Sequence, residues 1–77
     1  MLYSLWDIET SNLVAERRHR CDALSIVIEG IRRNGSHDTY ALSLDVEDDD
    51  GEVRTIAYGA ELAQLAKREF ALEQLAR

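Results

Sequence analysis

The sequence predicts an α+β fold, a four-stranded antiparallel sheet with two helices on one face. The apolar pattern alternates along four segments and recurs at helical spacing along two, in the order strand, strand, helix, strand, strand, helix (ββαββα). The chain has 77 residues and no proline, and no flexible linker divides it. Residues 1–77 are therefore expected to form a single small domain.

The first two strands are expected at residues 1–8 and 13–18, with a reversal in the polar segment between them. Apolar side chains fall on both faces of the first strand, with Trp6 on one face and Tyr3 and Leu5 on the other. A strand that is apolar on both faces is central in its sheet or has its second face covered.

Residues 22–34 fit two interpretations. At helical spacing their apolar side chains form one stripe, Asp22 lies where it would cap the start, and Gly35 lies where a left-handed residue would end the helix. As a strand, residues 24–28 alternate and are rich in β-branched side chains, and Asn34-Gly35 is a hairpin signal. We favour the helix because the residues at both ends of the segment and its apolar stripe all fit a helix.

The second hairpin is expected at residues 39–47 and 52–58. The first of these strands alternates cleanly between apolar and polar side chains, as in a sheet with one face open to water. The acidic segment 48–51 ends in Gly51, which can take the positive φ that a tight turn requires. The pattern therefore predicts two antiparallel strands joined by a short acidic turn.

Residues 60–77 predict a long helix, because good helix formers fill the segment and neither glycine nor proline interrupts it. Its apolar surface is broad. Ala71 and Leu75 lie well round the helix from Leu62, so one core is not expected to bury them all. The end of this helix is therefore expected to reach another molecule.

Several short motifs occur in order along residues 3–66. They are a Trp-Asp strand followed by Glu-Thr-x-Asn, then Ala-Leu and Asp-Asp-Gly in the second hairpin, then Ile-Ala-x-Gly before the last helix. This order resembles a group of small, uncharacterised bacterial proteins. The resemblance implies a helix at 22–34 and implies no activity. Ser11 stands where those proteins have a turn glycine, and the basic segment 16–20 replaces their acidic helix entry.

Charge and composition narrow the class of protein. The chain carries 15 Asp and Glu against 9 Lys and Arg, a net charge of −6, which disfavours a general polyanion binder. One cysteine excludes an intramolecular disulfide. No apolar run approaches the ~18 residues of a membrane span, and no basic-then-apolar leader opens the sequence. We expect a reduced, soluble, cytoplasmic domain that does not bind membranes.

No set of catalytic or metal-binding residue types has the spacing that its chemistry requires. Ser36-His37-Asp38 has the letters of a hydrolase triad, but adjacent side chains diverge, whereas a triad converges from separate elements. His19 and Cys21 are too few ligands for zinc. The acidic run 45–52 lacks the glycine and glutamate spacing of an EF-hand loop, which leaves a weak divalent-cation site as the alternative to a solvated turn. We expect no enzyme activity, no cofactor, no metal and no small-molecule substrate.

The arginines of the first half are the second candidate feature. Residues 1–35 are balanced in charge, and the whole negative excess lies in residues 36–77. Five arginines are predicted to meet in space as a basic patch, with five separately solvated side chains as the alternative; they are Arg17, Arg18, Arg20, Arg32 and Arg33. Such a patch would contact phosphate groups or an acidic surface, including the Asp48–Asp50 turn of a second copy.

The preferred hypothesis is a non-enzymatic protein-interaction module that forms a homodimer or binds another protein. A core in so short a chain rarely supplies more than about 3–5 kcal/mol, and association is the supplement that remains without disulfides or a metal. The predicted partner-facing residues are Tyr3, Leu5, Ala71 and Leu75. A small nucleic-acid-linked regulator of antitoxin or adaptor type, using the arginine patch, is the alternative. A monomer with an adequate core is the remaining outcome.

Overall fold

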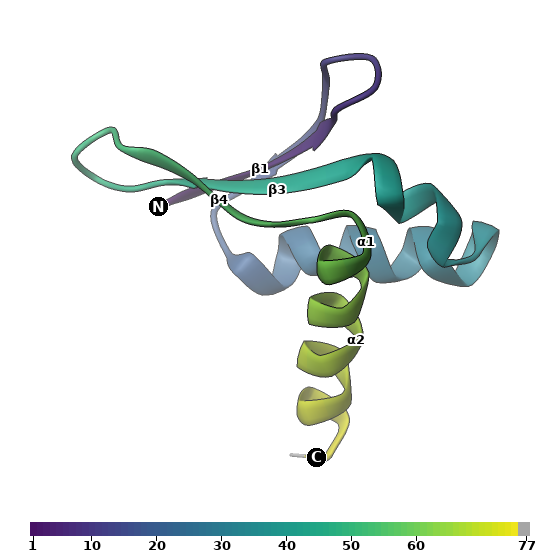
Figure 1. Cartoon of the computed structure of the whole chain (residues 1–77). Helices are drawn as coiled ribbons and strands as arrows, with labels where there is room; N and C mark the ends of the chain where they lie inside the picture. Colours follow the sequence, from purple (N-terminus) through teal and green to yellow (C-terminus); the bar gives the residue numbers. More distant parts are fainter. Residues whose placement is uncertain (76–77) are drawn as a thin grey trace.

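The predicted fold is confirmed. A computed structural model describes the backbone of residues 1–75 and the side chains of residues 1–35 and 37–70. The sheet is antiparallel throughout, with the strand order β2-β1-β3-β4. Its elements are β1 (Leu2–Asp7), β2 (Asn12–Arg17), α1 (Arg20–Asn34), the short 3-10 helix η1 (Ser36–Ala41), β3 (Leu42–Glu47), β4 (Val53–Tyr58) and α2 (Gly59–Leu75). Both helices lie on the same side of the sheet, which leaves its other face open (Figure 1).

β1 pairs with β2 on one edge and with β3 on the other, so it is a central strand, which is one of the two arrangements that its two apolar faces predict. On the helix side, Leu5 lies between Ala15 and Leu44 in one row across the strands. Leu5 and Leu44 are completely buried. Trp6 points to the open face, where it is half-buried.

The contested segment is a helix, and the strand alternative is wrong. Its buried residues follow helical spacing: Ala23, Leu24, Val27 and Ile28. The predicted cap is also wrong, because α1 begins at Arg20, His19 holds the cap position without a side-chain bond, and Asp22 lies inside the first turn. A carboxylate there still favours the helix, since the N-terminus of a helix carries partial positive charge.

The predicted strand 39–47 is shortened at its start. Residues 36–41 form η1, and β3 begins at Leu42, opposite Asp7, the last residue of β1. Beyond that point the neighbouring strand ends, so a longer β3 would have no partner except the single bond from Ile8 N–H to the Ala41 carbonyl (2.8 Å). η1 instead packs against both helices and buries Thr39.

α2 packs through its first half and then leaves the sheet (Figure 1). Leu62, Leu65 and Ala66 are buried against the sheet and α1, and Phe70 is half-buried at the edge of the core. The side chains of Ala71 and Leu75 lie outside the described residues, so their predicted contact with a partner stays a prediction.

Ser11 carries the backbone conformation for which glycine is the usual residue. It is the one non-glycine residue among 1–75 with positive φ, at 59°, and it lies in the turn between β1 and β2. A side chain there costs about 1–2 kcal/mol in the left-handed region. We expect Ser11→Gly to raise the free energy of unfolding by about 1 kcal/mol in urea titrations, with Ser25→Gly, inside α1, lowering it. An unchanged midpoint for Ser11→Gly would contradict this backbone geometry.

Candidate functional site

The open face of the sheet carries a row of apolar side chains from β2, β1 and β4, with Ser43 of β3 between them. Leu13 on β2 lies opposite Trp6 on β1, Trp6 lies opposite Ser43 on β3, and Ser43 lies opposite Tyr58 on β4. Leu13 is 43% exposed and Tyr58 60% exposed, whereas Ser43 is buried between two large aromatic neighbours. Ile8 continues the alternation of β1 beyond Trp6 and is 50% exposed. We call Trp6, Ile8, Leu13 and Tyr58 the apolar row.

The middle of the open face is polar. The next row across the strands runs from Glu16 through Ser4 and Asp45 to Thr55. The Asp45 carboxylate accepts hydrogen bonds from the hydroxyls of Thr55 (2.9 Å) and Ser43 (3.2 Å). These bonds hold the Asp45 carboxylate between β3 and β4. The open face is thus apolar near the β1–β2 turn and polar in its middle, and its last row, Leu2–Glu47–Val53, mixes apolar and acidic side chains.

One of the predicted partner-facing residues is corrected by the structure. Leu5 is completely buried in the core, so the prediction that it meets a partner is wrong. Tyr3 is half-buried against the same core, and its hydroxyl lies 3.7 Å from the Met1 sulfur. The cause is the direction of the strand: Tyr3 and Leu5 point to the helix side, and the exposed apolar surface of β1 is the Trp6 face.

The five predicted arginines do not form one patch. Arg20 is at the start of α1, and Arg32 and Arg33 are in its last turn, about 18 Å away along the axis. Glu29 pairs with both of the latter, at 3.3 Å to Arg33 and 4.0 Å to Arg32. Arg18 lines a hollow with acidic residues of β3 and its turn, on the side opposite to Arg17.

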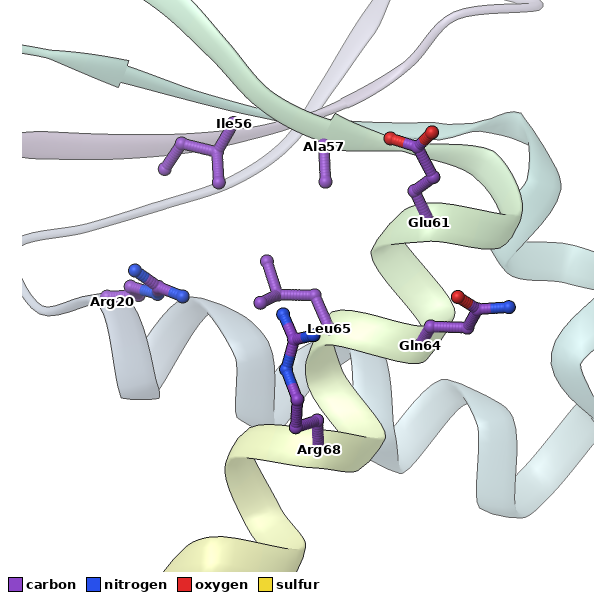
Figure 2. A pocket seen from close by; sticks show the side chains of 7 residues that line it. All are labelled: Arg20, Ile56, Ala57, Glu61, Gln64, Leu65 and Arg68. Atoms are coloured by element: carbon purple, nitrogen blue, oxygen red, sulfur yellow. The ribbon is translucent and has the colours of Figure 1, made fainter.

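A different set of arginines does come together, on the helix side of the sheet. Two adjoining hollows of about 280 and 250 Å³ share Arg20 and Ile56; Arg68 on α2 lines the first and Arg54 on β4 lines the second. In Figure 2, Ile56 points down from β4 and Leu65 points up from α2, with Arg20 and Arg68 at the mouth. We call this the arginine groove; its rim is Arg20, Arg54 and Arg68, and its floor is Tyr3, Val46, Ile56 and Leu65.

The charge of the arginine groove is partly balanced. Arg20 is bonded to Glu69 of α2, and Glu61 lies in the same hollow. Arg17 lies outside the groove, at the β2 end of the row that contains Tyr3, and its guanidinium group donates to the Glu16 carbonyl at 2.7 Å. Arg54 and Arg68 have no ion pair with any described residue. Sequence reasoning missed both because they are far from Arg20 in the sequence, and only the pairing of β4 and the path of α2 bring them to the same groove.

The described side chains whose types are typical of catalytic or metal sites do not lie close to one another. His37 lies in η1 with its ring 5.7 Å from the Tyr40 ring, edge-on, and Asp38 is exposed. Cys21 is exposed in α1, one residue after the arginine that begins the helix. Among residues whose side chains are described, no three His, Cys, Asp or Glu side chains gather where a metal ion could be held.

The acidic turn is a compact hydrogen-bonded structure. One oxygen of the Asp48 carboxylate accepts the backbone N–H groups of Asp50 (2.9 Å) and Glu52 (3.0 Å). Gly51 has φ 84°, as its place in the turn predicts. Asp49 points outward and lies 3.6 Å from the N-terminal ammonium group. The turn therefore presents the carboxylates of Asp49, Asp50 and Glu52 on a rigid frame.

Comparison with known proteins adds no family to this description. The chain matches no family model, no curated protein and no solved structure. Within residues 1–75, neither helix has the length and apolar character that crossing a membrane requires. The candidate sites are therefore the apolar row and the arginine groove, each defined by its own geometry.

Proposed function

We propose that this protein is a non-enzymatic interaction module that forms a homodimer through the apolar row. One observation carries the proposal: a tryptophan, a tyrosine, a leucine and an isoleucine lie together on a sheet face that neither helix covers. Grouped exposed apolar side chains, especially Trp and Tyr, are typical of protein–protein contacts. The predicted excess of apolar surface is thus placed on this face in the proposal, not on Leu5.

Four strands about 4.8 Å apart and six residues long define a face of roughly 19 by 20 Å. That is about half the area that a standard interface buries on each partner, which places this dimer among the small, weak interfaces. The acidic side chains then favour one of two possible twofold axes for the dimer. A twofold axis along the strands would place Asp45 of one copy against Asp45 of the other. An axis along the apolar row stacks the row on itself and carries the two Asp45 side chains to opposite sides.

The homodimer is preferred over a nucleic-acid-linked regulator because the structure does not assemble the patch on which that alternative rests. Arg32 and Arg33 are engaged by Glu29, and Arg18 lies beside acidic groups. A net charge of −6 adds a general repulsion against phosphate.

The test changes one exposed tyrosine and keeps another as its control. Tyr58→Asp places a charge in the apolar row, and we expect sedimentation velocity to show at least a 30-fold weaker dimer, about 2 kcal/mol. Tyr40→Asp is the matched control: Tyr40 is 52% exposed but lies in η1, off the sheet face. Trp6 is the only tryptophan, so its emission should shift with protein concentration in the wild type and not in Tyr58→Asp.

A wild-type chain that sediments as a monomer up to about 1 mM would overturn the proposal, because that limit means an association weaker than about −4 kcal/mol. Equal weakening by Tyr58→Asp and Tyr40→Asp would overturn the assignment of the interface to the apolar row. Thermal unfolding of each variant, followed by circular dichroism, confirms that the comparison is made between folded chains.

A further inference from the structure

We infer a second, ionic self-contact in which the acidic turn of one copy, Asp49–Glu52, docks into the arginine groove of another. This contact uses a surface different from the apolar row, and it goes beyond the proposed dimer. It is heterologous, joining two unlike patches, so it builds chains or rings where the apolar row builds closed pairs.

The groove is chemically complementary to a ligand that is acidic and partly apolar. Arg54 and Arg68 carry guanidinium groups without an ion pair among the described residues, and Arg20 shares its charge with Glu69. Guanidinium groups bind carboxylates through two parallel N–H bonds, which gives both strength and direction. The floor between them is apolar, since Ile56 and Leu65 meet there from β4 and α2 (Figure 2).

The acidic turn is complementary to that groove in both respects. Asp50 and Glu52 form no ion pair with any described residue, and Asp49 has only its loose contact with the N-terminus. Two exposed apolar side chains, Val53 and Met1, flank the carboxylates. The Asp48 carboxylate holds the turn in one shape, so little conformational entropy is lost when it docks.

Arg54 lines a further hollow with Asp48 and Glu52 of its own turn. The β3–β4 turn nevertheless projects away from α2, on which Arg68 lies, so a turn that reaches both Arg54 and Arg68 must come from another copy (Figure 1). A nucleic acid fits the same groove less well. Its phosphates would meet Glu61 and Glu69 as well as the arginines, and its backbone offers nothing apolar to the floor.

The test is a charge swap in the Tyr58→Asp background, which removes the apolar-row contact. Arg54→Glu/Arg68→Glu reverses the groove, and Asp49→Arg/Asp50→Arg reverses the turn while leaving Asp48 to hold it. At about 0.01 M salt, where charges act over roughly 30 Å, we expect the parent chain to self-associate and each double variant to lose at least about tenfold in affinity. An equimolar mixture of the two double variants should regain the association, because the unchanged turn of one variant meets the unchanged groove of the other, and the reversed turn meets the reversed groove.

Arg32→Glu is the matched control, since it reverses an exposed arginine outside the groove and should leave the association unchanged. Association that survives about 1 M salt, where screening acts within roughly 3 Å, or a mixture that fails to recover, would overturn the inference. The inference would also be overturned if the parent chain does not self-associate but binds a single-stranded RNA, and if Arg54→Glu/Arg68→Glu abolishes that binding. Failure of this test leaves the apolar-row dimer intact, because that dimer is measured separately in the chain with Tyr58.

Discussion

Replacing Leu5 with alanine is expected to remove most of the stability of this protein. Leu5 is completely buried at the centre of the core row, between Ala15 and Leu44. Leucine-to-alanine changes at such sites cost about 2–5 kcal/mol, because transfer energy and cavity energy add. A core in so short a chain rarely supplies more than about 3–5 kcal/mol. The two figures overlap, so we expect Leu5→Ala to be largely unfolded at 25 °C.

Urea titration followed by circular dichroism and by Trp6 emission measures this loss. Leu13→Ala is the matched control, because it removes the same atoms from the neighbouring strand at a 43% exposed position. At dilute protein, where association does not contribute, Leu13→Ala should change the free energy of unfolding by less than about 1 kcal/mol. If Leu5→Ala costs no more than its control, Leu5 is not in the core, and the original assignment of Leu5 to a partner would return.

Gly35→Ala is expected to be the next most damaging change. Gly35 has φ 82° and ψ 170°, a region that side-chain-bearing residues almost never occupy. Its N–H donates to the Ile31 carbonyl at 2.8 Å, which ends α1 and directs the chain into η1. An added Cβ would meet no atom within 4 Å, so the cost is purely that of the backbone, about 1–3 kcal/mol.

Gly30→Ala is the control, and we expect it to change the stability in the opposite direction. Gly30 is inside α1 with an ordinary helical backbone, and an added Cβ there also meets nothing within 4 Å. Alanine in place of glycine inside a helix stabilises by about 0.5–1 kcal/mol. Thermal unfolding midpoints should therefore rise for Gly30→Ala and fall for Gly35→Ala. Two midpoints that move in the same direction would contradict the end of α1 at Asn34.

The secondary structure was largely predictable because its signals are local. Alternation identified the strands of both hairpins, and the stripe of α1 was stronger than its β-branched content. The errors lie at element ends. The pattern of β3 continues back to Thr39, but β1 ends at Asp7, so the preceding residues turn into η1. Asp22 has the chemistry of a cap, but the helix begins at Arg20.

The candidate sites were less predictable, since each depends on residues distant in sequence. The apolar row joins Leu13, Trp6 and Tyr58 through the register of three strand pairs. The arginine groove joins Arg20 with Arg54 and Arg68 through the position of β4 and the departure of α2 from the sheet. Neither grouping has a spacing signal, because residue spacing along the chain does not contain strand order.

From its sequence alone, this protein is recognisable as a ββαββα domain with an acidic second half. Periodicity is a property of neighbouring residues, so it can be recognised without knowledge of the fold. Which side of β1 faces the helices was not available from that periodicity, since both sides are apolar. The packing of Leu5 against Leu44 and α1 settled it, and placed Trp6 rather than Leu5 on the surface that meets a partner in our proposal.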